Sequence, residues 1–221
     1  MNQHPGVIGE KVGMTQIFDE KGEVVRCTVV HAACTVLGKR TKDKDGYSAL
    51  VLGLGERTEK RTKKPVLGQF KKLGQTPKQF VRELRASEEH VAKFEVGQKL
   101  PLDQVFEAGQ FVDAQGKSRG RGFSGVIRRW SMAGSVGSHG THEYFRHGGS
   151  IGTNMTPGRT LPGLKMPGHY GHETVSALNL KIAKVLPEDD LILIEGAVPG
   201  PKGALVTIRG AVKKNGGKKK K

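Results

Sequence analysis

Short apolar runs separated by turn-forming residues cover most of the chain and predict strands. Near the start, residues 7–8 and 14–18 lead to a turn at 19–22, and residues 24–30 lead away from it. Apolar runs on either side of such a turn predict a β-hairpin. Residues 49–54 form one more apolar run and predict a third strand.

The clearest strand pattern lies at residues 175–185. Here Leu178, Leu180 and Ile182 alternate with polar or small residues, and a period of two indicates a half-buried strand. Many short strands with Gly and Pro in the turns predict a mainly β fold, and specifically a closed β-barrel. The further strands are predicted at 93–96, 99–102, 110–112, 191–195 and 204–209.

Residues 56–93 interrupt this pattern. Their first part, 56–74, is basic and broken by Pro and Gly, which predicts a loop or a small lobe on the surface. Apolar residues at roughly helical spacing predict a short helix at 77–85. We therefore expect a basic loop and helix insertion that forms a small mixed α/β lobe.

Residues 117–172 have a composition unlike the rest of the chain. They hold eight Lys and Arg against one acid, Glu143, together with thirteen glycines, five of the eight histidines and the only tryptophan. So few aliphatic residues cannot bury enough surface to order the segment alone. The segment is therefore predicted to be an extended arm that becomes ordered on a polyanion. The predicted organisation is a globular barrel domain at 1–116 and 173–212, the arm at 117–172 and a basic flexible tail at 213–221.

The charge of the whole chain agrees with this prediction. A net charge of +16 and a pI of about 10.0 favour nucleic acid or an anionic membrane surface as the partner. No apolar run approaches the roughly 20 residues of a membrane span, and the first residues lack the apolar core of a signal peptide. We expect a cytoplasmic chain without a membrane partner. RNA is favoured over DNA because no recognition helix or zinc finger is visible.

Two enzyme motifs occur in the arm without the setting that they need. Residues 120–125 match G-x-G-x-x-G, which requires a strand before it and a helix after it, and residues 116–119 are not predicted to be a strand. Residues 148–152 match G-x-S-x-G, which requires a helix directly after the serine. Pro157 and Gly158 follow too soon for such a helix. The chain is therefore predicted not to be an enzyme and to use no cofactor or small-molecule substrate.

Metal binding is not predicted either. Cys27, His31 and Cys34 lie close together but lack a fourth ligand, and their neighbours read as a strand. The histidines of the arm occur as H-x-x-H-E among glycines, not as H-E-x-x-H on a helix. They are expected to stack on bases or to donate to phosphates. The alternatives to RNA binding in a larger assembly are a metal- or nucleotide-using enzyme on a basic barrel and a free-standing RNA chaperone.

Five ordered blocks of sequence resemble the bacterial form of the family of large-subunit ribosomal protein three. They are GVIGEKVGMTQIFDEKGEVV, KRTKKPVLGQFKKLG, KSRGRGFSGVIRRW, GGSIGTNMTPGR and LILIEGAVPGPKG, and they run from residue 6 to residue 203. The resemblance implies a barrel of the translation-protein type and an extension that runs through the large-subunit (23S-type) rRNA toward the peptidyl transferase centre. It also implies early binding near the 3′ domain of that rRNA and contact with neighbouring large-subunit proteins.

The expected contacts combine this resemblance with the chemistry of the side chains. Arginine binds phosphate through planar paired contacts, and Trp130, Tyr144, Phe145 and Tyr170 offer surfaces for stacking. Packing against the barrel is the alternative for Trp130. The expected rRNA-binding residues are Lys11, Arg61, Lys63, Lys64, Lys71, Lys72, Lys117, Arg119, Arg121, Arg128, Arg129, Trp130, His139, His142, Arg146, His147, Asn154, Arg159, Lys165 and His169. The tip near the peptidyl transferase centre is expected at Ser150, Gly152, Thr153, Asn154, Met155, Thr156 and Pro157, with Asn154 nearest the catalytic RNA.

The chain departs from the family pattern in three places. Residues 161–172 carry fewer Lys and Arg than the family usually has there. The tip loop contains no glutamine, so the glutamine methylation of some bacterial members is not expected. Glu10 stands where the family usually has lysine, which makes Lys11 the expected contact.

Overall fold

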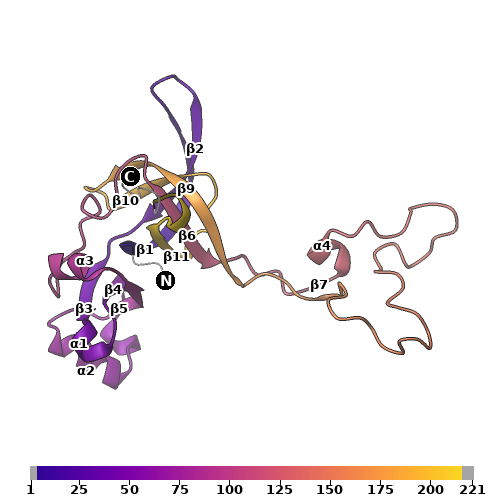
Figure 1. Cartoon of the computed structure of the whole chain (residues 1–221), viewed down its shortest axis with the longest axis horizontal. Coiled ribbons are helices and arrows are strands. Elements are labelled where there is room, and N and C mark those ends of the chain that lie inside the picture. Colours follow the sequence, from indigo (N-terminus) through magenta and orange to yellow (C-terminus); the bar gives the residue numbers. More distant parts are fainter. Residues whose placement is uncertain (1–3, 216–221) are drawn as a thin grey trace, which may run out of the picture. The chain divides into compact units, whose positions relative to one another are not determined.

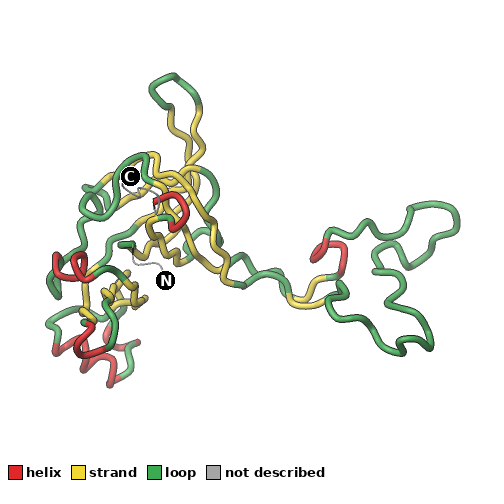
Figure 2. Tube along the Cα trace, in the orientation of Figure 1, coloured by secondary structure: helices red, strands yellow, loops and turns green. Residues whose placement is uncertain are grey.

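The computed structural model of the 221-residue chain describes residues 4–215. The chain divides into two compact units, one made of Met1–Lys117 with Thr174–Lys221 and the other of Ser118–Glu173. Strand residues outnumber helical residues in the described part (Figures 1 and 2), which confirms the prediction of a mainly β chain.

Six strands of the first unit pair in a cyclic order. Their order is β1-β11-β6-β9-β10-β2, and β2 pairs back with β1, which is the strand order of a closed barrel. Every pairing is antiparallel. The strands are β1 (Gly6–Phe18), β2 (Val24–His31), β6 (Phe111–Lys117), β9 (Thr174–Leu186), β10 (Leu191–Glu195) and β11 (Leu205–Gly210).

The period of two in the sequence explains why these segments form strands. In β11 every second residue is fully buried, and in β6 Val112 and Ala114 are buried while Gln115 between Ala114 and Gly116 is exposed. One face of each strand therefore faces the core. The predicted hairpin at 14–30 is present as β1 and β2, and the strands predicted at 191–195 and 204–209 correspond to β10 and β11.

The remaining strands of the first unit form a separate three-stranded sheet. Its order is β3-β4-β5, with β3 (Thr35–Arg40), β4 (Ala49–Glu56) and β5 (Lys78–Arg85). The strand predicted at 49–54 is thus real, but it lies outside the cyclic sheet. Around this sheet are α1 (Lys42–Asp45), a 3-10 turn η1 (Glu59–Arg61), α2 (Lys64–Lys72) and α3 (Glu88–Lys93). Apolar residues of both sheets belong to one buried cluster.

The predicted helix at 77–85 is wrong, because this segment is β5. Phe80 and Leu84 are four residues apart, a spacing that fits one face of a helix and one face of a strand equally well. Pairing with β4 decides between them, with Leu84 opposite Leu50 and Phe80 opposite Leu54.

The predicted strands at 93–96 and 99–102 are also wrong. The first is the end of α3 and a turn, and in the second only Lys99 forms an isolated bridge, with Thr35. The apolar residues Phe94, Leu100 and Leu102 are each 1% exposed. These three side chains are buried in the core although their backbone forms no strand, so their burial does not require pairing within a β-sheet.

The alternation predicted for 175–185 is broken by a β-bulge. Ile182 is buried, but Leu178 is 51% exposed. The pairing of β6 with β9 shifts between Val112 and Ala114, and Asn179 at this point has a positive φ of 55°. One extra residue in β9 moves the side chains beyond it to the opposite face.

The second unit contains little regular structure. It has β7 (Phe123–Ser124) paired with β8 (Gly168–His169) and the short helix α4 (Val126–Trp130), and the rest is loop (Figure 2). Ser124, Val126 and Gly171 are its only buried residues. The unit has almost no core of its own, in line with the composition of the segment. In the predicted tail at 213–221, residues up to Asn215 belong to α5 (Val212–Asn215), and residues 216–221 lie outside the described part.

Candidate nucleic-acid interface

The two ends of Ser118–Glu173 run side by side as a narrow stem. The Ser118 N–H donates to the Glu173 carbonyl at 2.8 Å, and the Arg121 N–H donates to the Tyr170 carbonyl at 2.9 Å. The short β7–β8 ladder continues this pairing. Gly171 makes the close approach possible: its φ is +74°, and a Cβ there would lie 2.2 Å from the Arg119 carbonyl oxygen.

Beyond the stem, Trp130 fastens the outgoing limb to the returning one. Its Nε1–H donates to the Met166 carbonyl at 2.8 Å, and Arg129 Nη1 donates to the same oxygen at 2.9 Å. The Arg129 guanidinium lies 4.9 Å from the indole centre and the Lys165 ammonium 5.9 Å from it, within cation–π range. Trp130 is 39% exposed, so part of its ring remains available for stacking.

Other aromatic side chains of this unit are also partly exposed. The Arg121 guanidinium stands 5.3 Å from the Tyr170 ring centre. Tyr144 and His147 meet edge to face, with ring centres 4.8 Å apart. Phe123, which is not among the predicted contacts, is 80% exposed on β7. Its place among the arginines and glycines of 119–125 is the signal that could have identified it.

The cations of Ser118–Glu173 are not neutralised within the unit. Arg119, Arg128, Arg146 and Arg159 are exposed, and all of Ser118–Glu173, which the structure describes throughout, forms no ion pair. The first unit is different, because it contains pairs such as Lys99 with Asp190 at 2.6 Å. An exposed group of cations without acidic partners produces a positive potential that attracts polyanions.

The predicted tip is a loop in which every residue from Ser150 to Pro157 is exposed. It is held by its own short contacts: the Ser150 hydroxyl donates to the Gly152 carbonyl at 3.1 Å, and the Thr153 hydroxyl donates to the Thr156 carbonyl. Asn154 and Met155 lie between these contacts, and Met155 is 88% exposed. The loop presents these two side chains outward.

The predicted contacts of the first unit fall into two groups. Lys11 is directed inward: its Nζ donates to the carbonyls of Val198 at 2.7 Å and Gly200 at 3.3 Å, which fastens the loop before β11. The others are exposed on η1, on α2 and its N-cap, and at the end of β6. They are Arg61, Lys63, Lys64, Lys71, Lys72 and Lys117.

The histidines predicted as contacts are exposed and separate. His139, His142, His147 and His169 all lie on the surface of the second unit, and no group of three or more metal-ligating side chains occurs among residues 4–215. The two cysteines are both buried. The Cys34 thiol donates to the Ile8 carbonyl at 2.8 Å, and burial raises its pKa to about 12.

The two enzyme motifs lack the strand and helix arrangement that their functions require. The expectation that no strand precedes G-x-G-x-x-G is nevertheless wrong. Gly116 and Lys117 do belong to a strand, β6, and Gly125 precedes α4. However, β6 pairs only antiparallel and α4 is five residues long, so no strand–helix–strand unit for a dinucleotide is formed. The G-x-S-x-G match is followed by loop.

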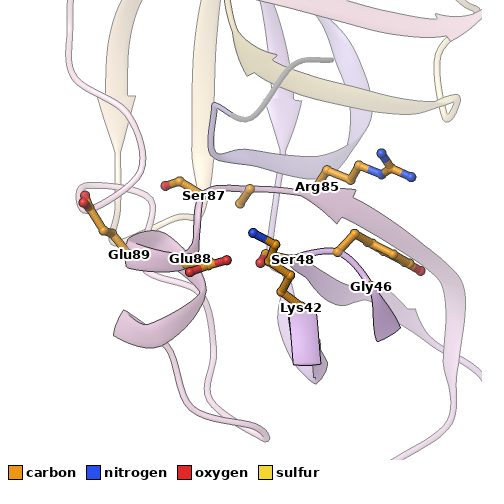
Figure 3. Close-up of a pocket in the computed structure, with 9 residues that line it drawn as sticks. Lys42, Gly46, Ser48, Arg85, Ser87, Glu88 and Glu89 are labelled. Atoms are coloured by element: carbon orange, nitrogen blue, oxygen red, sulfur yellow. The ribbon is translucent and has the colours of Figure 1, made fainter. Parts of the chain in front are cut away.

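A pocket beside the three-stranded sheet does not supply catalytic chemistry either (Figure 3). It is lined by Lys42 and Arg85, by Glu88 and Glu89, and by two serines. The Arg85 guanidinium lies 4.8 Å from the Tyr47 ring centre. No histidine or cysteine lines the pocket, so neither serine has an imidazole base beside it.

Comparisons with known proteins find relatives among the proteins of the large ribosomal subunit. The family model described as Ribosomal protein L3 matches residues 44–190. The chain is 78% identical over 218 residues to the large ribosomal subunit protein uL3 of Sorangium cellulosum (strain So ce56), covering 99% of this chain and 94% of the relative. Identity to the protein of the same name from Myxococcus xanthus (strain DK1622) is 46% over 210 residues (94% and 93%), and to that of Brachyspira hyodysenteriae (strain ATCC 49526 / WA1) 45% over 215 residues (97% and 97%).

The exposed uncompensated cations and these matches define the chain first as a ribosomal protein. It belongs to the ribosomal protein L3 family. Members of this family are structural proteins, so the predictions that the chain is not an enzyme and that it acts in the ribosome of the bacterial cytoplasm are confirmed. Among the helices of residues 4–215, none is long and apolar enough to cross a membrane.

Proposed function

We propose that the chain is a structural constituent of the large ribosomal subunit and binds its rRNA directly through Ser118–Glu173. The observation that carries the proposal is the set of exposed arginines in this unit, Arg119, Arg128, Arg146 and Arg159, that no acidic side chain neutralises. Each arginine that meets a phosphate releases condensed counterions, which drives binding at low salt.

The nearly coreless second unit supports the same proposal. A segment with three buried residues gains little from burying its own surface, and RNA contacts compensate for the entropy lost on ordering. The stem and the Trp130 contact hold the two limbs together, so the exposed cations are presented on a defined backbone. The segment thus acts as an rRNA-penetrating extension of the first unit.

The finer roles rest on the family resemblance. The first unit is proposed to be a barrel of the translation-protein type that anchors the chain, and Ser118–Glu173 to extend toward the peptidyl transferase centre. The loop around Asn154 lies nearest that centre and positions RNA without taking part in the reaction. Binding takes place early in assembly, near the 3′ domain of the rRNA, beside other large-subunit proteins.

The test of direct rRNA binding is a salt titration with a charge-matched control. In one variant Arg119, Arg128, Arg146 and Arg159 are replaced by Gln. The log–log slope of affinity against salt is expected to become shallower by about 3, at about 0.7–0.9 per phosphate contact. The control replaces exposed lysines of the first unit by Gln and removes the same charge. These lysines are Lys42, Lys44, Lys93 and Lys184.

Equal slopes for the two variants would show that the contacts are not made by the second unit. A deletion of residues 135–168 extends the test: it is expected to leave a folded first unit with much weaker rRNA binding. An unchanged affinity after the deletion contradicts the proposal. Sedimentation of the full chain outside ribosomes would instead indicate a free RNA chaperone.

The role of the tip is tested by comparing two responses to Asn154→Ala. Sensitivity to antibiotics of the peptidyl transferase centre is expected to change while the yield of assembled subunits stays close to normal. Ser138→Ala, at another exposed position of the same unit, is the control. Severe loss of assembly with unchanged sensitivity would reverse the proposed roles of tip and stem.

A further inference from the structure

The outer part of the β1–β2 hairpin is a two-stranded ribbon with no third strand beside it (Figure 1). On one side, the contacts of β1 with the loop before β11 end at Lys11, whose backbone bonds Gly203 and Ala204. On the other side, the Gly196 N–H donates to the Arg26 carbonyl at 2.8 Å, and the β2–β10 ladder begins at Cys27. Within the described residues, both edges of the ribbon beyond these points are unpaired.

The ribbon carries large apolar side chains on its surface. Met14 is 58% exposed, Phe18 67% and Val24 52%. Phe18 and Val24 are directly opposite in the ladder, and Met14 is four residues before Phe18 on the same strand. The three side chains therefore share one face, with the facing pair Gln16 and Arg26 between them. A two-stranded hairpin has marginal stability alone, and clustered exposed apolar residues mark interaction sites.

The end of the ribbon has the opposite charge to the rest of the chain. Residues 19–23 contain three acids and one lysine in a protein of net charge +16. The Asp19 carboxylate accepts the N–H groups of Lys21 at 3.0 Å and Glu23 at 2.8 Å, which orders the turn. Glu20 and Glu23 are exposed and form no ion pair with any described residue.

This charge decides between RNA and protein as the occupant. Phosphates placed beside Glu20 and Glu23 would be repelled, whereas Lys or Arg side chains would be attracted. We propose that the ribbon is a protein-docking element: the face with Met14, Phe18 and Val24 packs against an apolar patch of a second, basic protein whose lysines pair with Glu20 and Glu23. This role goes beyond rRNA binding by Ser118–Glu173 and uses a different surface.

A carbodiimide joins a carboxylate to a lysine amine in direct contact with it, which makes it the probe for this surface. Purified large subunits that contain the full chain are treated with carbodiimide and analysed by mass spectrometry. The expected product joins Glu20 or Glu23 to lysines of one neighbouring protein. Absence of such a product, or bonds only to lysines of a second copy of this chain, overturns the proposal.

A photo-crosslinking residue at position 18 separates protein from RNA as the occupant. Phe18→benzoylphenylalanine is expected to crosslink to the same neighbouring protein. Crosslinking to rRNA, or to nothing, overturns the proposal. The same residue at Val96, which is 48% exposed elsewhere in the first unit, is the matched control and is expected not to label that protein.

The apolar face is tested with Met14→Ser combined with Phe18→Ser. The carbodiimide product is expected to fall about tenfold or more, since truncated apolar anchors dominate the loss of binding, while affinity for rRNA alone stays within about twofold. Val66→Ser combined with Val96→Ser is the control. An unchanged yield of the product overturns the proposal. If the proposed function itself were wrong, the unmodified chain would be missing from purified large subunits. That result differs from an unchanged yield of the carbodiimide product, which contradicts only the docking proposal.

Discussion

The Trp130 indole N–H and the Met166 carbonyl form a 2.8 Å hydrogen bond that joins two stretches 36 residues apart in the chain. Arg129 donates to the same oxygen. In a unit with three buried residues, this shared acceptor replaces a hydrophobic core as the means of holding the two limbs at a fixed distance. Because the exposed arginines lie on both limbs, this bond of the only tryptophan also fixes how far apart they are.

Trp130→Phe is expected to loosen the returning limb without unfolding the stem. The variant loses one donor but keeps an aromatic ring beneath Arg129 and Lys165, so the cost is that of one hydrogen bond, about 0.5–1.5 kcal/mol. Amide exchange at residues 164–166 should become about two- to tenfold faster. Unchanged exchange there would mean that Arg129 alone holds Met166. Phe145→Leu, at another exposed aromatic, is the control.

Gly171→Ala and Gly163→Ala form a matched pair for the stem. Both glycines have positive φ, +74° and +82°, but a Cβ at Gly171 would lie 2.2 Å from the Arg119 carbonyl, whereas a Cβ at Gly163 has nothing within 4 Å. Both variants bear the strain of an L-residue at positive φ, roughly 1–2 kcal/mol. Only Gly171→Ala must also separate the limbs. We expect rRNA affinity to fall clearly more for Gly171→Ala, and equal losses would contradict the proposed stem.

Cys34 makes stability fall at high pH. Burial is the main cause that raises the pKa of its thiol from 9.0 to about 12, and Asp190 adds to it, while the bond to Ile8 opposes the shift. Between pH 9 and 12 the unfolded chain has released this proton and the folded chain keeps it. The unfolded state then binds fewer protons, so this group lowers stability by about 1.4 kcal/mol per pH unit in that window. Below the lower pKa it contributes nothing.

Urea unfolding of the native chain and of Cys34→Ala at pH 8, 9.5 and 10.5 measures this contribution. Below pH 9 the unfolding free energies of the native chain and of Cys34→Ala should differ by a constant amount. From pH 9.5 to pH 10.5 the native chain should lose about 1.4 kcal/mol of stability relative to Cys34→Ala. Parallel pH profiles would contradict the assignment. The buried thiol should also react with a thiol reagent only after unfolding.

Asp113 stabilises the bulge where the alternation of β9 breaks. Its carboxylate accepts the N–H of Asn179 at 2.8 Å and the N–H of Val212 at 3.3 Å. Asp113→Ala leaves both donors without this acceptor, and bonds to a charged acceptor contribute roughly 1.5–3 kcal/mol. Thermal unfolding should show a loss of about this size. Gln115→Ala, which removes an exposed bond to Ser176, should cost less than about 0.5 kcal/mol.

Sequence patterns located the β1–β2 hairpin and the strands β10 and β11 because short apolar runs are bounded there by turn residues. They failed where one spacing fits two structures, as at Phe80 and Leu84 in β5. They also missed α2, because Pro65 and Gly68 suggested a broken loop. Pro65 stands at the first turn of α2, where a missing N–H costs nothing.

The candidate site was predictable in its charge but not in its geometry. Composition alone identified the cations of 117–172, because the excess of Lys and Arg over acidic residues can be counted in the sequence without a structure. The partner of Trp130 is a main-chain carbonyl, at Met166, and a sequence of side chains does not show which backbone groups will be near. The hydrogen bonds of Lys11 were not predictable for the same reason, because its acceptors are the main-chain carbonyls of Val198 and Gly200.

The pairing of β1 with β11 has a consequence for how the protein is made. Gly6 pairs with Arg209, and Val7 with Ile208, so the cyclic sheet is completed only after almost the whole chain has been synthesised. Ser118–Glu173 leaves the exit tunnel before the last strands do. During translation its arginines are therefore exposed to cellular RNA while the first unit is still incomplete, and premature capture by RNA competes with folding. Slow closure of contacts distant in sequence lengthens that period, so the time for which these arginines are exposed beside an incomplete first unit is set by the pairing of β1 with β11.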